Sequence, residues 1–158
     1  MSFFRAADTG PIFLGPGDIY TFLATKAETD GAYFVLEGMV PPDAGPPPHI
    51  HHNQVETIYI VEGQLEIMLG DEVYEAKAGD FVHVSIGTPH RFINRSQTPA
   101  KIIATFVPAG DIEEFFRESF KETTDRNAPP ESLTDAFIQR LLEAADRHDI
   151  EILPPPEG

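Results

Sequence analysis

The sequence predicts an all-β fold, a β-sandwich or barrel, with two α-helices packed outside it near the C-terminus. Three observations lead to this fold class. Residues 11–108 contain many short segments rich in β-branched and aromatic side chains. Glycine and proline turns separate these segments. From residue 110 to residue 148 the apolar side chains recur at helical spacing instead.

We expect the 158 residues to form a single domain, because a chain of this length buries one substantial core. Residues 1–10 are interpreted as an N-terminal arm and residues 11–108 as the β-barrel. Residues 110–148 are expected to form a helical extension, and residues 149–158 a tail.

The strands are predicted from alternating apolar patterns bounded by turn residues. Asp30-Gly31 and Gly70-Asp71 are turn signals between neighbouring strands. Three prolines ahead of His49 hold the backbone extended, so a strand is expected to start there at the rim of the barrel. The other predicted strands cover residues 11–14, 19–25, 32–40, 55–61, 65–69, 73–76, 81–84, 90–93 and 101–107.

Two helices are expected after the strands. In the first, Asp111 is the predicted N-cap and Glu114 the matching residue of a capping box. Ser132 is the predicted N-cap of the second helix. Residues 150–153 are expected to add a strand. The apolar faces comprise Ile112, Phe115, Phe116 and Phe120 in the first helix, and Leu133, Phe137, Leu141 and Ala145 in the second.

Composition narrows the classes of partner. A formal net charge of -15 opposes binding to phosphate backbones, so we expect no contact with nucleic acid. The chain shows no apolar run of membrane-spanning length and no secretion signal, so we expect a soluble cytoplasmic protein that does not contact membranes. The sequence has 0 cysteines, which leaves histidines and carboxylates as candidate metal ligands.

Four side chains stand out as a possible metal site: His49, His51, Glu56 and His90. Two histidines at positions i and i+2 of a strand point to the same face. Most of the set shares a face with apolar residues, and burying several ionisable groups is costly unless they are paired or bind a metal. We therefore predict a metal site, with a purely structural polar cluster as the alternative.

The remaining histidines are weaker candidates. His52 follows His51 and should face the other way, so we expect no role for it at the site. His83 is interpreted as a core or rim residue of a short strand. His148, near a helix end, is expected to be structural.

The spacing of these residues resembles the two motifs of the cupin superfamily. The first is matched by His49-x-His51, four residues, Glu56, six residues and Gly63, although Gly45 lies closer to His49 than the motif asks. The second motif is matched by Gly79, Gly87, His90 and Asn94, although Ser85 stands where the motif usually has a proline. This resemblance implies a double-stranded β-helix, or jelly-roll, barrel.

A narrower resemblance is to small bacterial quercetinase-like cupins. It rests on the Pro-Pro-His-Ile-His-His-Asn segment, the Gly-Thr-Pro-His-Arg-Phe segment and a Glu-Glu-Phe-Phe helix. The resemblance implies one divalent transition metal per chain (nickel, cobalt, manganese, iron or zinc) held by His49, His51, Glu56 and His90. It also implies cleavage of a flavonol or similar enol or phenol with O2 and release of carbon monoxide, with Glu56 as the base.

An aromatic substrate requires an apolar pocket, and the expected walls are Tyr33, Phe34, Ile58 and Phe92. Two other functions stay open, because cupins are functionally diverse. One is a different cupin enzyme, such as an isomerase or a decarboxylase. The other is a non-catalytic cupin that binds a small molecule. Because barrel edges of this kind are commonly covered by a partner, we also expect a homodimer with the N-terminal arm in the contact.

Overall fold

A computed structural model of the chain describes residues 1–155. Its strands form two antiparallel sheets, one of seven strands in the order β11-β1-β2-β3-β10-β5-β8 and one of five in the order β12-β4-β9-β6-β7. The strands are β1 (Ile12–Leu14), β2 (Ile19–Ala24), β3 (Phe34–Val40), β4 (His49–His51), β5 (Val55–Glu62), β6 (Gln64–Leu69), β7 (Glu72–Lys77), β8 (Phe81–Val84), β9 (His90–Ile93), β10 (Ala100–Val107), β11 (Lys121–Thr123) and β12 (Ile150–Ile152).

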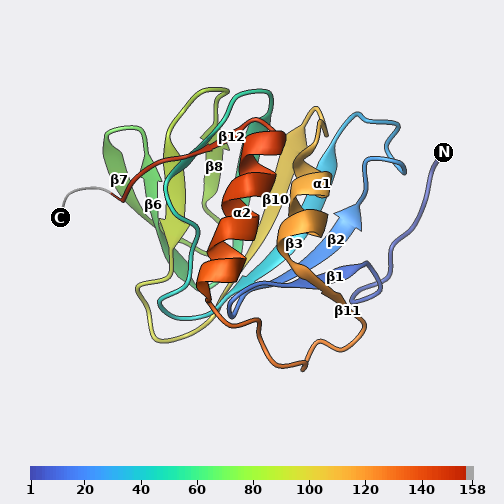
Figure 1. Ribbon diagram of the computed structural model, residues 1–158, viewed down its shortest axis with the longest axis horizontal. Helices are drawn as coiled ribbons and strands as arrows, with labels where there is room; N and C mark the ends of the chain where they lie inside the picture. The colour runs from blue at the N-terminus through green and yellow to red at the C-terminus, as the bar shows by residue number, and fades with distance from the viewer. Residues whose placement is uncertain (156–158) are drawn as a thin grey trace.

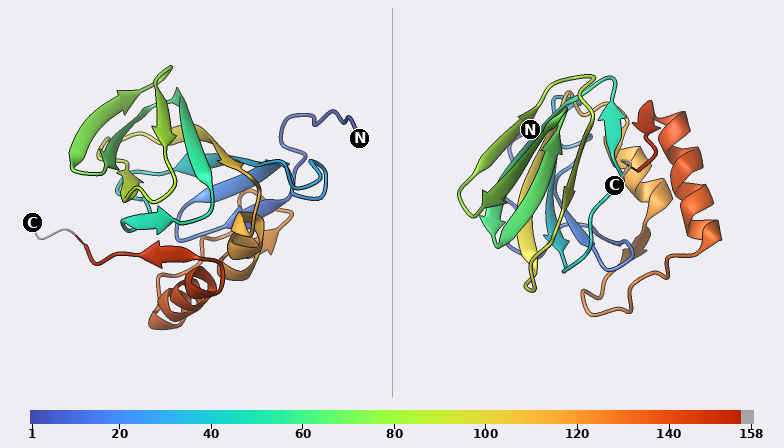
Figure 2. Two further views of the ribbon diagram at one scale, coloured as in Figure 1. Left: turned by 90° about the horizontal axis from the view of Figure 1, so that it is seen from above. Right: turned by 90° about the vertical axis from the view of Figure 1, so that its left-hand side faces the viewer.

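The two helices are α1 (Ile112–Ser119) and α2 (Asp135–Arg147). Figure 1 shows them next to each other in front of the strands, and the right-hand view of Figure 2 shows them as a layer beside the sheets. The predicted all-β fold class with two helices outside is therefore confirmed. Within residues 1–155, neither helix is long and apolar enough to cross a membrane.

The alternating patterns predicted the inner faces of the strands correctly. On β5, Glu56, Ile58 and Ile60 are at most 5% exposed. The turn predicted at residues 70–71 joins β6 to β7, with Leu69 paired opposite Glu72. Strand alternation therefore turns Glu56 toward the core together with two isoleucines.

Two apolar clusters form the core. One lies between the sheets and includes Ile58, Ile60 and Phe92. The other joins the seven-stranded sheet to both helices and includes Phe22, Phe34 and many further aromatic side chains. The helices therefore bury their apolar faces against strands, and they are part of the core of the protein.

Strand pairing also extends into the C-terminal third of the chain. The predicted strand at residues 150–153 is present as β12, which pairs with β4 so that Ile150 lies opposite His51. Strand β11 was not predicted, because its Lys-Glu-Thr sequence has no apolar alternation. It pairs through its backbone with the exposed edge of β1.

The predicted N-cap of α1 is correct in position, and the predicted N-cap of α2 is wrong. Asp111 precedes α1, but its side chain makes no capping hydrogen bond. Its carboxylate lies 3.6 Å from Lys26 and 3.4 Å from His148 instead. Ser132 and Leu133 precede α2, which is capped by Thr134: the hydroxyl oxygen of Thr134 accepts a hydrogen bond of 3.1 Å from the Phe137 amide. Leu133 therefore lies outside the apolar stripe of α2, and its side chain is 69% exposed.

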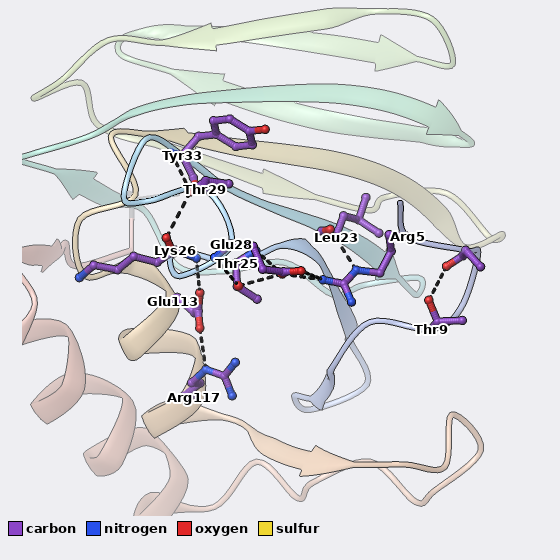
Figure 3. A network of polar contacts seen from close by, with 11 residues as sticks. Arg5, Thr9, Leu23, Thr25, Lys26, Glu28, Thr29, Tyr33, Glu113 and Arg117 are labelled. Carbon is purple, nitrogen blue, oxygen red and sulfur yellow. Dashed lines mark hydrogen bonds and ion pairs between the residues drawn. The ribbon is translucent and has the colours of Figure 1, made fainter. Parts of the chain in front are cut away.

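A polar network outside the barrel holds the β2–β3 loop in place (Figure 3). Arg5 of the N-terminal arm binds both carboxylate oxygens of Glu28, at 2.5 and 2.6 Å. The Lys26 amide donates to Glu113 of α1 at 2.7 Å. On the same loop, the Thr29 hydroxyl donates to the carbonyl of Tyr33 at 2.6 Å, which places Tyr33 on the outer surface.

His148 links the end of α2 to α1. Its Nε2 lies 2.8 Å from Glu118, and its Nδ1 lies 3.4 Å from Asp111. Partial burial opposes the charged imidazole, but the hydrogen bonds to Glu118 and Asp111 outweigh it and raise the pKa of His148 above 6.5. The structural role expected for His148 is consistent with these contacts.

The Thr134 cap is testable with a matched pair of variants. Thr134→Ala removes the acceptor for the Phe137 amide, and we expect it to lower the free energy of unfolding by about 1 kcal/mol. Ser132→Ala, at the position that the sequence wrongly favoured, is expected to have no measurable effect. Urea unfolding followed by circular dichroism compares the two, and equal losses would contradict the assignment.

The His148 contacts predict a pH-dependent contribution to stability. The folded-state pKa is raised, so the stabilisation is fully present below about pH 6.5 and is lost as the pH rises through the folded-state value. The difference in unfolding free energy between wild type and His148→Gln should therefore be larger at about pH 6 than at about pH 9. A difference of the same size at both pH values would contradict this contribution.

Candidate metal centre

The four predicted residues come together from both sheets. His49 and His51 lie on β4, Glu56 on β5, and His90 is the first residue of β9, directly opposite His49 in the β4–β9 ladder. Each offers one ligand atom, and these atoms all lie within 4.8 Å of one another. His51, Glu56 and His90 are at most 6% exposed.

Tight backbone turns place the histidines. A Cβ atom on Gly45 would lie 2.1 Å from the Phe92 carbonyl oxygen, so only glycine lets the segment ahead of β4 approach β9 this closely. Gly87 has a φ of 83°, and its amide donates to the His51 carbonyl at 3.0 Å. This hydrogen bond attaches the turn that precedes His90 to the strand that carries His51.

Backbone carbonyls orient two of the imidazole rings. The Nδ1 atom of His49 lies 2.8 Å from the Pro47 oxygen, and the Nδ1 atom of His90 lies 2.9 Å from the Thr88 oxygen. A carbonyl only accepts, so each Nδ1 carries the proton and each Nε2 presents a lone pair when the ring is neutral. This is the orientation in which metal-binding histidines are usually held.

The arrangement around Glu56 requires a positive species. Glu56 Oε2 lies 2.8 Å from Nε2 of His90 and 3.2 Å from Nε2 of His51. If His90 were neutral with its proton on Nδ1, a lone pair would face a carboxylate oxygen at 2.8 Å, which is repulsive. Either a proton or a metal ion must therefore lie on the Nε2 side of His90.

The pKa shifts describe the same charge balance. Burial, reinforced by the nearby His90 and His51, lowers the pKa of His49 to about 3, so this ring is neutral at physiological pH. Burial opposes the charged form of Glu56, but hydrogen bonds from His51 and His90 outweigh it and hold the pKa of Glu56 well below its usual range. For His90, burial is likewise outweighed by the hydrogen bond to Glu56, and its pKa is raised.

These residues fit a divalent ion of the first transition series. Three imidazoles and one carboxylate form a donor set that such ions accept. The Nδ1 atom of His51 is buried without a hydrogen-bond partner among the described residues. One ring nitrogen of the cluster therefore has no partner within residues 1–155. His49, His51, Glu56 and His90 would hold the ion.

The other histidines lie outside this cluster. His52 faces away from it, is exposed and lies 2.9 Å from Glu151. His83 is exposed on β8 instead of being a core residue. Only the i and i+2 pair of the histidine-rich segment therefore reaches the inner face, as strand alternation predicted.

A largely apolar cavity of about 290 Å³ lies next to the cluster. His49, His51 and Glu56 line it, and most of the remaining wall is aromatic or aliphatic. Of the expected walls, Phe92 lines the cavity, whereas Tyr33, Phe34 and Ile58 do not. Phe92 is therefore the one expected wall residue that borders this cavity.

The misplaced walls have clear physical reasons. Phe34 is 0% exposed because it packs inside the helix-side cluster, and Ile58 is 1% exposed inside the cluster between the sheets. Tyr33 belongs to the outer β2–β3 loop and is 40% exposed (Figure 3). Strand alternation tells which side chains face inward, but it does not tell which of them border a cavity.

Sequence reasoning missed the walls that come from outside the central strands. Phe115, Phe116 and Phe120, in and just after α1, line the cavity together with Asp18 and Tyr20. The helix had been expected only to pack against the barrel. The available signal was three phenylalanines within six residues at and just after the predicted helix.

The fold and site define a cupin-type barrel with a histidine-carboxylate cluster. Residues 32–106 match the family model described as a cupin domain, in agreement with the motif spacing. The chain is also similar to Quercetin 2,3-dioxygenase of Bacillus subtilis (strain 168), with 27% identity over 146 residues. That match covers 92% of this chain but only 42% of the relative, so the chain spans less than half of its length.

Solved structures support the fold. An RmlC-like cupin from Shewanella frigidimarina superposes with a TM-score of 0.63 at 20% identity, covering 72% of this chain and 96% of that chain. The polyketide cyclase RemF from Streptomyces resistomycificus gives a TM-score of 0.58 at 21% identity, covering 67% and 80%. At such identities these likenesses establish a shared fold alone.

The cluster predicts which histidines control metal binding. His51→Ala and His90→Ala should each weaken binding of nickel or zinc by at least about 10-fold, because each removes a donor atom. His52→Ala and His83→Ala are matched controls that should keep wild-type affinity. Calorimetric titration of chelator-treated protein measures both affinity and stoichiometry. Wild-type affinity in His51→Ala and His90→Ala would contradict the assignment.

Proposed function

We propose that this protein is a metal-dependent cupin dioxygenase that cleaves a flavonol, or a similar enol or phenol, with O2. The observation that carries the proposal is the position of the cluster of His49, His51, Glu56 and His90 beside an apolar, phenylalanine-rich cavity. The similarity to Quercetin 2,3-dioxygenase over 92% of this chain supports the same reaction class. Because the chain spans only 42% of that relative, activity and substrate belong to the proposal.

Glu56 is the group suited to accept the proton of the substrate hydroxyl. Its carboxylate is ionised, lies at the wall of the cavity, and presents Oε2 to the two histidine rings. A bound divalent ion would supply Lewis acidity that lowers the pKa of that hydroxyl. Proton transfer to Glu56 then leaves the substrate as an electron-rich anion that O2 oxidises.

The cavity residues position the substrate and exclude water. Phe92 from the barrel and Phe115, Phe116 and Phe120 from the helical side provide flat apolar surface for an aromatic molecule. Holding the reactive carbon and oxygen of the substrate beside the cluster reduces the entropic cost of the reaction. The homodimer expected from the exposed sheet edges is a further part of this proposal.

Oxygen uptake with a panel of flavonols tests the proposal. Chelator-treated protein is reloaded separately with nickel, cobalt, manganese, iron or zinc, and we expect uptake that depends on the metal. Glu56→Gln keeps the shape of the side chain but removes the proton acceptor, so kcat should fall by about 100-fold or more. Glu62→Gln, on the exposed end of the same strand, is the control that should retain wild-type turnover.

The alternatives give different results in this assay. Absence of oxygen uptake from wild type that holds one ion per chain would overturn the dioxygenase proposal. Tight binding of a flavonol without turnover would then indicate a non-catalytic binding protein. Conversion of a substrate without oxygen consumption would indicate an isomerase or a decarboxylase.

A further inference from the structure

The wall of the apolar cavity carries a second pair of buried polar side chains, in addition to the histidine-carboxylate cluster. Asp18 and Tyr20 line the same cavity and are 8% and 6% exposed. Glu56 belongs to the cluster, and the third carboxylate of the lining, Asp43, is exposed to water. Among the described residues, Asp18 and Tyr20 are thus the buried polar side chains of the cavity wall that have no role in the proposed reaction.

The pair is rigidly built. The Tyr20 hydroxyl donates to Asp18 Oδ2 at 2.7 Å. The Tyr20 ring packs against Phe116 and Phe120 with ring centroids 5.0 and 5.1 Å apart. The Gly15 amide donates to the Asp18 carbonyl at 3.0 Å, which closes the turn that brings Asp18 to the cavity wall. The carboxyl group is therefore held in one position by both its side chain and its backbone.

The Asp18 carboxyl has unused hydrogen-bonding capacity. In residues 1–155, its side chain has the Tyr20 hydroxyl as its one hydrogen-bond partner, and no lysine, arginine or histidine pairs with it. A nearly buried carboxyl in this state lowers stability unless something else satisfies it. Such a cost is typical of groups kept for binding or catalysis.

The geometry of the pair suits a hydroxyl group as its ligand, because the carboxyl has an oxygen that Tyr20 does not use. Burial raises the pKa of Asp18 to about 6, although the Tyr20 hydrogen bond acts in the opposite direction. Burial, followed by the Asp18 carboxylate, raises the pKa of Tyr20 well above its usual value, so its phenol stays protonated and keeps donating to Asp18. A carboxyl group accepts a hydrogen bond from a hydroxyl as an anion and donates one to it when protonated.

We propose that Asp18, held in place by Tyr20, is a specificity-determining residue that binds a second hydroxyl of the substrate while the reactive hydroxyl lies at the cluster of His49, His51, Glu56 and His90. This inference rests on the proposed function and narrows its substrate class. The preferred substrate is an aromatic molecule that carries a second hydroxyl in addition to the reactive one. A buried carboxyl left without its partner disfavours an analogue that lacks the second hydroxyl.

The test compares two flavonols on metal-reloaded protein. 3-Hydroxyflavone carries the reactive hydroxyl alone, whereas quercetin carries additional ring hydroxyls. Binding is measured by anaerobic calorimetry, and kcat/KM by oxygen uptake in air. Wild type should prefer quercetin by about 10-fold or more, as expected for a buried hydrogen bond to a carboxyl group.

Three variants and one control separate the role of Asp18 from a general packing effect. Asp18→Asn keeps part of the preference, because an amide still bonds a hydroxyl. The double variant Asp18→Leu with Tyr20→Phe makes this wall apolar without leaving the phenol unpaired, and it should lose the preference through weaker binding of quercetin. Tyr20→Phe alone should weaken the preference, because it frees the carboxyl. Asp71→Asn, a matched change at an exposed carboxylate outside the cavity lining, should leave the preference unchanged.

The outcomes distinguish this inference from the proposed function. If wild type turns over both flavonols and the double variant keeps the quercetin preference, the role of Asp18 is overturned while the dioxygenase proposal stands. If wild type binds neither flavonol, both are overturned. If quercetin binds without oxygen uptake and the preference disappears in the double variant, the dioxygenase proposal fails and the assignment of Asp18 is supported. Unchanged metal content in every variant shows that the cluster is intact.

Discussion

The burial of three imidazoles and a carboxylate at one point inside an apolar barrel is the constraint on which this structure depends. Charge of this kind is tolerated only when it is balanced, and here Glu56 lies within 3.2 Å of His51 and His90. The backbone keeps the groups from separating, because carbonyls of Pro47 and Thr88 hold two of the rings. The glycine and proline turns around β4 and β9 carry these carbonyls and so fix the orientations of the rings.

The elements outside the central barrel complete the cavity. The cupin domain match ends at residue 106, yet α1 and α2 contribute Phe115, Phe116 and Phe137 to the wall. The same side chains bury apolar surface against the strands, so the helical extension stabilises the fold and closes the cavity at once. Differences in substrate choice between barrels of this kind are therefore expected to arise in such extensions, while the cluster itself stays within the strands.

The sequence predicted the cluster well and the cavity poorly, for physical reasons. A strand has a period of two, so His49 and His51 must share a face, and the same rule turned His52 outward. The faces of Glu56 and His90 followed from their apolar neighbours. Cavity walls depend on how distant elements meet, and no local pattern shows that Phe34 packs inside the core while Phe116 borders a space. The cap of α2 was missed because Ser132 and Thr134 are equally plausible from composition.

The two buried carboxyl groups of the cavity, Glu56 and Asp18, have pKa values that their surroundings shift in opposite directions. Glu56 faces two histidines, which keep it ionised in spite of its burial. Asp18 faces a phenol, which donates one hydrogen bond but carries no positive charge, so burial dominates and its pKa rises to about 6. Groups with pKa values pushed apart in this way suit different tasks. Glu56 remains a carboxylate and is therefore available as a metal ligand or as a hydrogen-bond acceptor. Asp18 exchanges readily between acceptor and donor, which suits recognition of a hydroxyl and does not require a metal.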